Sequence, residues 1–326
     1  MVARMRERFA LSPSAYRRVA QVALFALAGI VLTGAAVRLT GSGLGCPDWP
    51  KCYGKAVAPL ETHAMIEYGN RILSGLVGFA AIAVFAGAWL RRPFRRDLFR
   101  LSVLLPVGVV AQAVLGGFTV RHHLAPGFVM AHFGLAMLML IAAVALAWRA
   151  TYEPGERSPV RDRLSAWSVR ALVPLGAVTI VAGTAATAAG PHAGGSGTGD
   201  EINRLQFKGA GTLDWAIHQH ARLAFVMGVA TVLVWLLLWR RRADPLTLRS
   251  VTVLAGLLAA QGAVGTLQYA LELPAEIVWV HVGLAAATWV ALLWAAAAAG
   301  APARTAAREP RETERPDRLV VETASR

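Results

Sequence analysis

Three histidines of the sequence, His132, His220 and His281, fall inside long apolar stretches. An ionisable side chain in such a stretch is costly and is seldom kept without a role. A single buried histidine is more often a hydrogen-bonded packing residue, but His220 and His281 lie in two different predicted helices at matching depths. Two neutral imidazoles that approach from opposite sides suit a six-coordinate heme iron, whose other four positions the porphyrin occupies. The pair therefore predicts a heme site, whereas zinc would need more ligands in a closer cluster.

A carboxylate also opens one of the apolar stretches. Glu67 lies in the first turns of its predicted helix, where a charge is expensive unless it binds a partner or transfers protons. Arg71 follows four residues later, so an ion pair within the helix is the alternative role for this carboxylate. We interpret Glu67 as the candidate catalytic group and keep the ion pair as the alternative.

Both cysteines of the chain, Cys46 and Cys52, lie in the short segment CPDWPKC. The segment falls in a predicted loop outside the cytoplasm, where a disulfide can persist. The compartment alone therefore predicts that the two cysteines pair. The alternatives are a structural staple without further role and a pair of free thiols.

The elements that must position these residues are apolar helices. Apolar residues make up 56% of the 326 positions and charged residues 16%, which indicates a lipid environment. A membrane span needs about 20 apolar residues. Stretches of that kind lie at 19–38, 66–90, 101–119, 128–148, 170–189, 214–239, 249–269 and 277–299. The sequence therefore predicts an all-α integral membrane protein with eight transmembrane helices.

Basic residues alternate between the two sides of the predicted membrane. The N-terminal arm, the tail after residue 300 and the loops at 91–100, 149–170 and 240–249 carry 25 Lys and Arg residues, whereas the opposite loops carry six. The positive-inside rule predicts that the richer side is cytoplasmic and holds both termini. Because the net charge of +14 is distributed in this way, we expect no nucleic-acid partner.

The two halves of the chain repeat each other. The segment AQAVLGGFTVRHHLAPGFVMAHFGLA, from Ala111, aligns without a gap with AQGAVGTLQYALELPAEIVWVHVGLA, from Ala260. At this offset of 149 the corresponding pairs are Gln112 and Gln261, Gly116 and Gly265, and His132 and His281. Each half has an even number of helices, so we expect two duplicated four-helix bundles related by a pseudo-twofold axis along the membrane normal.

The repeat divides the chain into predicted parts: a basic cytoplasmic arm (1–18), a first bundle (19–148), a cytoplasmic linker (149–169), a second bundle (170–299) and a disordered cytoplasmic tail (300–326). The bundles differ where chemistry is expected. At an offset of 150, position 70 corresponds to His220, and Ile217 stands in the second half where the first has Glu67. This asymmetry favours a reaction in the first bundle.

Several motifs together resemble the heme A synthase family. They are GAAVRLTGSGLGCPDWPKCYG, IEYGNR, AHFG, HQHAR and VHVG, and they extend over nearly all of the predicted bundles. The resemblance implies an oxidoreductase that oxidises the C8 methyl group of heme O to the formyl group of heme A by successive hydroxylations, for cytochrome c oxidase biogenesis. It implies heme b between His220 and His281 in the second half. The substrate heme O, and the product heme A, would bind at His132 in the first half.

One position departs from the family pattern. Many members have E-x-x-H-R at the start of the second helix, whereas this chain has Glu67-Tyr68-Gly69-Asn70-Arg71, the subtype with Asn at the histidine position. Asn70 cannot replace imidazole as a strong iron ligand, and His63 lies about 10 Å away along the helix, too far to take that place. We therefore expect His132 to bind the substrate heme alone and to leave one iron position open. The alternative is that a different residue serves.

The resemblance sets the remaining expectations. Arg71, Arg222 and Asn70 would contact heme, with the arginines as partners of its propionates. Expected partners are heme O, heme O synthase, cytochrome oxidase assembly proteins and an unidentified electron-transfer partner, and homo-oligomerisation stays open. The expected location is the plasma membrane of a bacterium. Two other functions remain, a diheme electron-transfer cytochrome and a non-catalytic heme carrier or assembly factor, and the asymmetry of the halves favours the enzyme over both.

Overall fold

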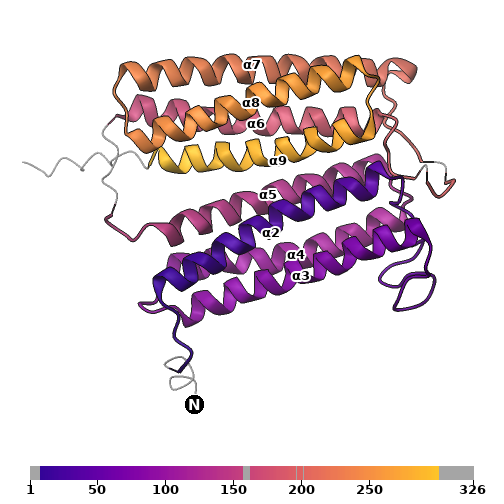
Figure 1. Cartoon of the computed structure of the whole chain (residues 1–326), viewed down its shortest axis with the longest axis horizontal. Coiled ribbons are helices and arrows are strands. Elements are labelled where there is room, and N and C mark those ends of the chain that lie inside the picture. The colour runs from indigo at the N-terminus through magenta and orange to yellow at the C-terminus, as the bar shows by residue number, and fades with distance from the viewer. Residues whose placement is uncertain (1–7, 157–161, 196, 201, 301–326) are drawn as a thin grey trace, which may run out of the picture.

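Long helices make up most of the structure. The computed structural model describes residues 8–156, 162–195, 197–200 and 202–300. Its long helices are α2 (Pro13–Leu39), α3 (Thr62–Leu90), α4 (Arg96–Arg121), α5 (Pro126–Thr151), α6 (Arg163–Ala189), α7 (Thr212–Arg240), α8 (Pro245–Ala270) and α9 (Ala275–Ala298), and a short 3-10 turn, η1 (Gly209–Gly211), precedes α7. They run side by side along the long axis of the molecule (Figure 1). The all-α prediction with eight helices is confirmed for the described residues.

All eight helices are long and apolar enough to cross a bilayer. The shortest, α9, has 24 residues, which at about 1.5 Å per residue is longer than the hydrocarbon core of about 30 Å. Large apolar side chains such as Phe25, Phe79 and Phe225 are mostly exposed on the outside of the helices. An apolar surface of this kind suits lipid, and the chain is a multi-pass membrane protein.

Capping residues extend the helices beyond the apolar stretches. α2 begins at Pro13, where the fixed φ of proline suits a first helical position and the Ser12 hydroxyl accepts a hydrogen bond from the Ala15 N–H at 3.2 Å. The helix thus starts within the segment predicted as a cytoplasmic arm. α5 likewise reaches Thr151 and α6 starts at Arg163, inside the predicted linker. The predicted tail, apart from residue 300, and residues 1–7 of the predicted arm lie outside the described residues.

Each half of the chain is a ring of four helices. In the first half α2 packs on α3, α3 on α4, α4 on α5, and α5 closes on α2; α6 to α9 pack in the same order in the second half. Figure 1 shows the two rings as separate layers, one from α2 to α5 and the other from α6 to α9. The same order of neighbours is what a duplicated bundle predicts, while the pseudo-twofold axis itself remains a prediction.

The two rings share one apolar core. The contacts between them join α5 to α9 and α6, and α2 to α9, and one cluster of buried apolar residues runs through both halves. In this interface the buried Trp289 of α9 donates its indole N–H to the Met137 carbonyl of α5 at 3.1 Å. The halves are therefore packed together by side chains and not merely joined by a linker.

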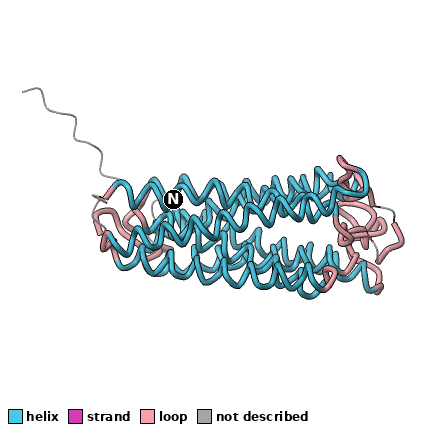
Figure 2. Tube along the Cα trace, turned by 90° about the horizontal axis from the view of Figure 1, so that it is seen from above, coloured by secondary structure: helices cyan, strands magenta, loops and turns pink. Residues whose placement is uncertain are grey.

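The loops gather at the two ends of the molecule (Figure 2). At the end that carries the cysteines, the long loop between α6 and α7 lies against the loop between α2 and α3. The Gly43 N–H donates to the Gly194 carbonyl at 2.7 Å, and the Gly197 N–H donates to the Gly41 carbonyl at 3.2 Å. A loop of the second half thus covers a loop of the first.

A bidentate ion pair joins the start of α6 to the end of α7. The Asp162 carboxylate caps α6 through the Ser165 N–H at 3.3 Å and accepts two hydrogen bonds from Arg241, at 2.7 and 3.0 Å. The hydrogen bonds from Arg241 hold the pKa of Asp162 below its usual range. Because the folded pKa is depressed, the ion pair stabilises the protein above the unfolded aspartate pKa of about 3.9, and this stabilisation is lost as the pH falls through the folded value.

We therefore predict that Asp162→Asn lowers the midpoint of thermal unfolding at pH 7, since asparagine still caps the helix but no longer pairs with Arg241. The difference from the wild type should shrink as the pH falls below about 4. High salt at pH 7 should also reduce it, because the pair is partly exposed. Unfolding of the detergent-solubilised protein followed by circular dichroism measures both effects, and a difference that does not depend on pH would contradict this role.

Candidate functional site

The structure brings His220 and His281 together. His220 comes from α7 and His281 from α9, and the centroids of their rings lie 6.2 Å apart with the ring planes at 80°. When two imidazoles bind one metal from opposite sides, each metal–nitrogen bond is about 2 Å long. Adding the distance from each bonded nitrogen to the centre of its ring puts the two centroids about 6 Å apart. The spacing therefore suits one iron between the two rings.

The neighbours of His220 leave one ring nitrogen available for a metal. Its Nδ1 lies 2.9 Å from the Thr179 carbonyl of α6. A carbonyl only accepts, so Nδ1 carries the proton and donates it, and Nε2 keeps its lone pair. A histidine that donates its second N–H to a backbone carbonyl is the usual arrangement of a metal ligand.

A glycine makes room for this ring. A Cβ at Gly183 of α6 would lie 2.9 Å from Cε1 of His220, closer than real Cβ contacts come. The imidazole thus lies directly against the α6 backbone. Any side chain at position 183 would move either the ring or the helix.

His281 lies in a similar setting formed by α8. A Cβ at Gly265 would lie 3.1 Å from its Cε1, and the Gln261 amide nitrogen donates to the His281 carbonyl at 3.1 Å. The same amide nitrogen lies 3.2 Å from Nε2 of the ring. His281 Nδ1 is buried and has no hydrogen-bond partner among the described residues.

The first half repeats the main features of this arrangement around His132. The ring on α5 lies over Gly116 of α4, where a Cβ would be 3.3 Å from its Cε1. Gln112 donates its amide N–H to the His132 carbonyl at 3.0 Å. His132 Nδ1 is buried without a hydrogen-bond partner in the described part of the chain. A ligand-competent histidine is therefore present in each ring of helices at corresponding positions.

The first half differs at position 70. Asn70 of α3 is half-buried, and its side-chain oxygen accepts a hydrogen bond from the Thr33 hydroxyl of α2 at 2.8 Å. An amide bound in this way does not supply an imidazole opposite His132. The first half therefore offers one histidine where the second offers two.

Glu67 is buried and bound at both oxygens. One oxygen accepts from the Cys46 N–H at 2.8 Å, and the other pairs with Arg71 at 2.5 Å. The two groups lie at the end of α3 that meets the cysteine loop. The alternative ion pair with Arg71 is thus present in the structure, and the carboxylate also holds the backbone of the loop.

Arg71 anchors the same loop through backbone carbonyls. Beyond its pair with Glu67, the guanidinium donates to Asp48 at 3.1 Å, to Lys51 at 2.8 Å and to Cys46 at 3.3 Å. The disulfide between Cys46 and Cys52 closes this loop, as predicted. A contact between Arg71 and a heme propionate remains a prediction, and it would compete with these bonds.

Arg222, the predicted heme contact in the second half, is more accessible than Arg71. Arg222 of α7 is exposed, and it makes no hydrogen bond or ion pair with any residue that the structure describes. A propionate at that position would meet a guanidinium with all its donors available. No group of three or more His, Cys, Asp or Glu among the described residues lies close enough to hold a metal ion.

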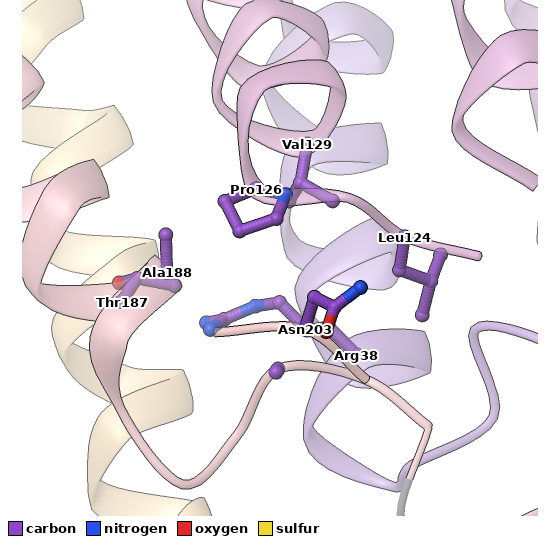
Figure 3. Close-up of a pocket in the computed structure, with 8 residues that line it drawn as sticks. Arg38, Leu124, Pro126, Val129, Thr187, Ala188 and Asn203 are labelled. Carbon is purple, nitrogen blue, oxygen red and sulfur yellow. The ribbon is translucent and has the colours of Figure 1, made fainter. Parts of the chain in front are cut away.

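A small cavity lies where the two halves meet, at the end of α2 (Figure 3). Arg38 reaches across it and donates to the His192 carbonyl at 3.0 Å. The cavity is about 10 Å³, which is about the room that one water molecule needs. It is too small for a heme and is separate from the imidazole pair. The lining residues are Arg38, Leu124, Pro126, Val129, Thr187, Ala188, Ala193 and Asn203.

Four residues around the imidazole pair had no predicted role: Thr179, Gly183, Gln261 and Gly265. The correspondence of Gln112 with Gln261 marks both glutamines as part of the repeat, so sequence contained a signal for Gln261. Sequence contained no signal for Gly183 or Thr179. Gly183 makes room for the ring because it has no side chain, and Thr179 contacts His220 through its backbone carbonyl.

Comparison with known proteins identifies a matching family and several relatives. The family profile described as cytochrome oxidase assembly protein matches residues 17–65 and 60–293. A heme A synthase of Alkalihalophilus pseudofirmus is 34% identical over 140 residues, which cover 42% of this chain and 46% of the relative. A heme A synthase of Halalkalibacterium halodurans is 31% identical over 134 residues, covering 40% and 44%. The chain thus spans less than half the length of the relatives that it matches.

The contact between Gly183 and His220 gives a direct test of the imidazole pair. We predict that Gly183→Ala displaces the His220 ring, because the new Cβ would lie 2.9 Å from Cε1. A heme bound to the protein should then lose most of its low-spin, bis-imidazole absorption. Gly228→Ala is the matched control, since a Cβ there meets nothing within 4 Å. An unchanged low-spin spectrum in the Gly183→Ala protein would argue against His220 as a ligand.

Proposed function

The chain belongs to the cytochrome oxidase assembly protein family, and on that premise we propose that it is a heme A synthase that oxidises the C8 methyl group of heme O to a formyl group. The observation that carries the proposal is the asymmetry of the two halves. The second half pairs two imidazoles at 6.2 Å, whereas the first has one histidine together with a buried carboxylate. A saturated site suits a resident cofactor, and an incomplete one suits a substrate.

In this proposal His220 and His281 hold heme b in the second half. The fit rests on the ring spacing and on the Thr179 carbonyl that leaves His220 Nε2 free. A heme bound there supplies electron transfer when it is present. Arg222 lies exposed on the same helix as His220 and would pair with a propionate.

The substrate heme O binds in the first half, with His132 as the residue that orients it. Asn70 and Thr33 form a neutral hydrogen-bonded pair on the neighbouring helices, so the opposite side of the substrate receives no second imidazole. Gly116 allows the His132 ring to lie against α4. Successive hydroxylations of one methyl carbon would each add an oxygen atom and remove two electrons, which would leave through the electron-transfer partner.

Glu67 is the group that we propose to hold or move a proton in the first half. Its position supports the proposal because it is buried and reaches the loop closed by the disulfide. Arg71 orients the carboxylate and ties the same loop to α3. These contacts also support a purely structural role, and the variants described below separate the two.

The cellular setting follows from the same proposal. The protein lies in the plasma membrane of a bacterium with both termini in the cytoplasm, as the basic loops indicate. Heme O synthase supplies the substrate, cytochrome oxidase assembly receives the product, and an electron-transfer partner accepts the electrons. Heme extraction from purified protein tests the function itself: heme O or heme A beside heme b supports the enzyme, and heme b alone at two per chain would favour a diheme cytochrome.

The ligand assignment predicts different results in the two halves. His220→Ala and His281→Ala should each abolish the low-spin spectrum of heme b, because losing one axial ligand changes the spin state. His132→Ala should keep that spectrum and lose heme A formation. Absorption and electron paramagnetic resonance spectra of the purified variants measure the first effect, and extracted hemes measure the second. Retention of the spectrum in both second-half variants would refute the heme b site.

Glu67→Gln distinguishes proton transfer from loop anchoring. Glutamine keeps the size of the side chain, so the fold and heme content should persist while heme O or its hydroxylated intermediate accumulates. If the carboxylate is only structural, losing this buried pair would instead destabilise the protein by up to about 3–5 kcal/mol, and heme A formed per folded protein would stay nearly normal. Arg71→Gln is the matched control, since it breaks the same pair without removing the carboxylate. If Glu67→Gln forms normal amounts of heme A per protein and Arg71→Gln forms less, then Arg71, and not Glu67, is the residue that heme A formation requires.

A further inference from the structure

The orientation of the Gln261 side-chain amide is determined by its contact with α9. One end of the amide lies 3.1 Å from the His281 backbone carbonyl. A carbonyl oxygen only accepts hydrogen bonds, so the end that faces it must be the NH₂ group. The orientation of this amide is therefore fixed by chemistry.

The same NH₂ group lies 3.2 Å from Nε2 of the His281 ring. An NH₂ group donates and does not accept, so Nε2 must be the accepting nitrogen of a neutral imidazole. The ring proton then belongs on Nδ1. Nδ1 has no partner among the described residues. The contact with Gln261 is therefore the interaction that determines which tautomer His281 adopts.

We propose that Gln261 is a positioning residue that holds His281 in the Nδ1–H tautomer, so that Nε2 keeps the lone pair that would bind a heme iron. This inference rests on the proposed heme b site and assigns the residue that prepares it. The Thr179 carbonyl gives His220 the same tautomer from the opposite side of the site. Both ligands are thus ready to bind iron through Nε2 without moving a proton.

The contact with Nε2 and the contact with the carbonyl have separate roles. The contact with the carbonyl joins α8 to α9, whereas iron binding at Nε2 would replace the contact with the ring and require the amide nitrogen to move away from it. The corresponding Gln112 bonds the His132 carbonyl at 3.0 Å but makes no bond to the ring. Tautomer control by glutamine is therefore specific to the second half.

The tautomer can be measured without heme. Histidine labelled with ¹⁵N and ¹³C, in protein produced without heme, reports which ring nitrogen carries the proton, and the His281→Asn variant identifies the signal. We expect the Nδ1–H form of His281 in the wild type and a mixture or the Nε2–H form in Gln261→Met. The Nε2–H form in the wild type would overturn the proposal.

Binding of heme b gives the second readout. We expect Gln261→Met to bind added heme b about tenfold more weakly, or to form the low-spin spectrum correspondingly more slowly, as for other residues that orient a metal ligand. Gln268→Met is the control on the same helix, since its side-chain oxygen is buried without a hydrogen bond. Gln112→Met should leave the second-half spectrum unchanged. Binding by Gln261→Met at the wild-type affinity and rate would overturn the proposal.

Two further outcomes keep the interpretation unambiguous. If Gln261→Met fails to fold, Gln261→Asn replaces it: the shorter side chain keeps an amide but reaches less far, and it should show the same tautomer change. Gln261→Asn with a wild-type tautomer and affinity would overturn the inference. Absence of heme b binding in the wild type would instead refute the heme site, and the tautomer measurement would still decide what Gln261 does to His281.

Discussion

Each imidazole that could reach a heme iron lies directly against the backbone of the helix that precedes its own in the chain. His132 rests on Gly116, His220 on Gly183 and His281 on Gly265, with hypothetical Cβ contacts of 2.9 to 3.3 Å. This requirement sets how closely α4 approaches α5, α6 approaches α7 and α8 approaches α9. A larger residue at any of the three glycines would move a ring or separate two helices. The packing of both bundles is therefore tied to the positions of the rings.

In the proposed function, the same ring of four helices would support two different chemistries, and the difference lies in the residues at the two sites. The glycine, the glutamine and one histidine recur in both, and they define the shared part of each site. The second half adds His220 and gains a pair of facing imidazoles. The first half has Asn70, Glu67 and the disulfide loop in the same region, and these residues give it a hydrogen-bonding character. In the proposed function, one ring of helices would thus keep a fixed cofactor while the other receives the substrate.

Sequence predicted the fold well because lipid leaves few options. Each span must satisfy its backbone hydrogen bonds internally, so apolar stretches of sufficient length must be helices. The repeat at an offset of 149 also indicated which helices correspond, and the compartment predicted the disulfide, whereas the orientation inferred from the basic loops stays a prediction. Helix ends were less predictable, since Ser12 starts α2 within a charged arm. The contacts of Glu67 with the Cys46 N–H and of Gln261 with His281 depend on loop path and side-chain direction, which no residue pattern specifies.

The cover that the second half places over the first has a consequence for the order of events during synthesis. Gly41 and Gly43 find their backbone partners at Gly197 and Gly194, which the ribosome adds only after four helices of the first half and a further helix have been made. Until then the cysteine loop has no neighbour from the second half, and on its predicted extracytoplasmic side it would be open to oxidising enzymes. Cys46 and Cys52 can therefore pair before the later loop docks on Gly41 and Gly43.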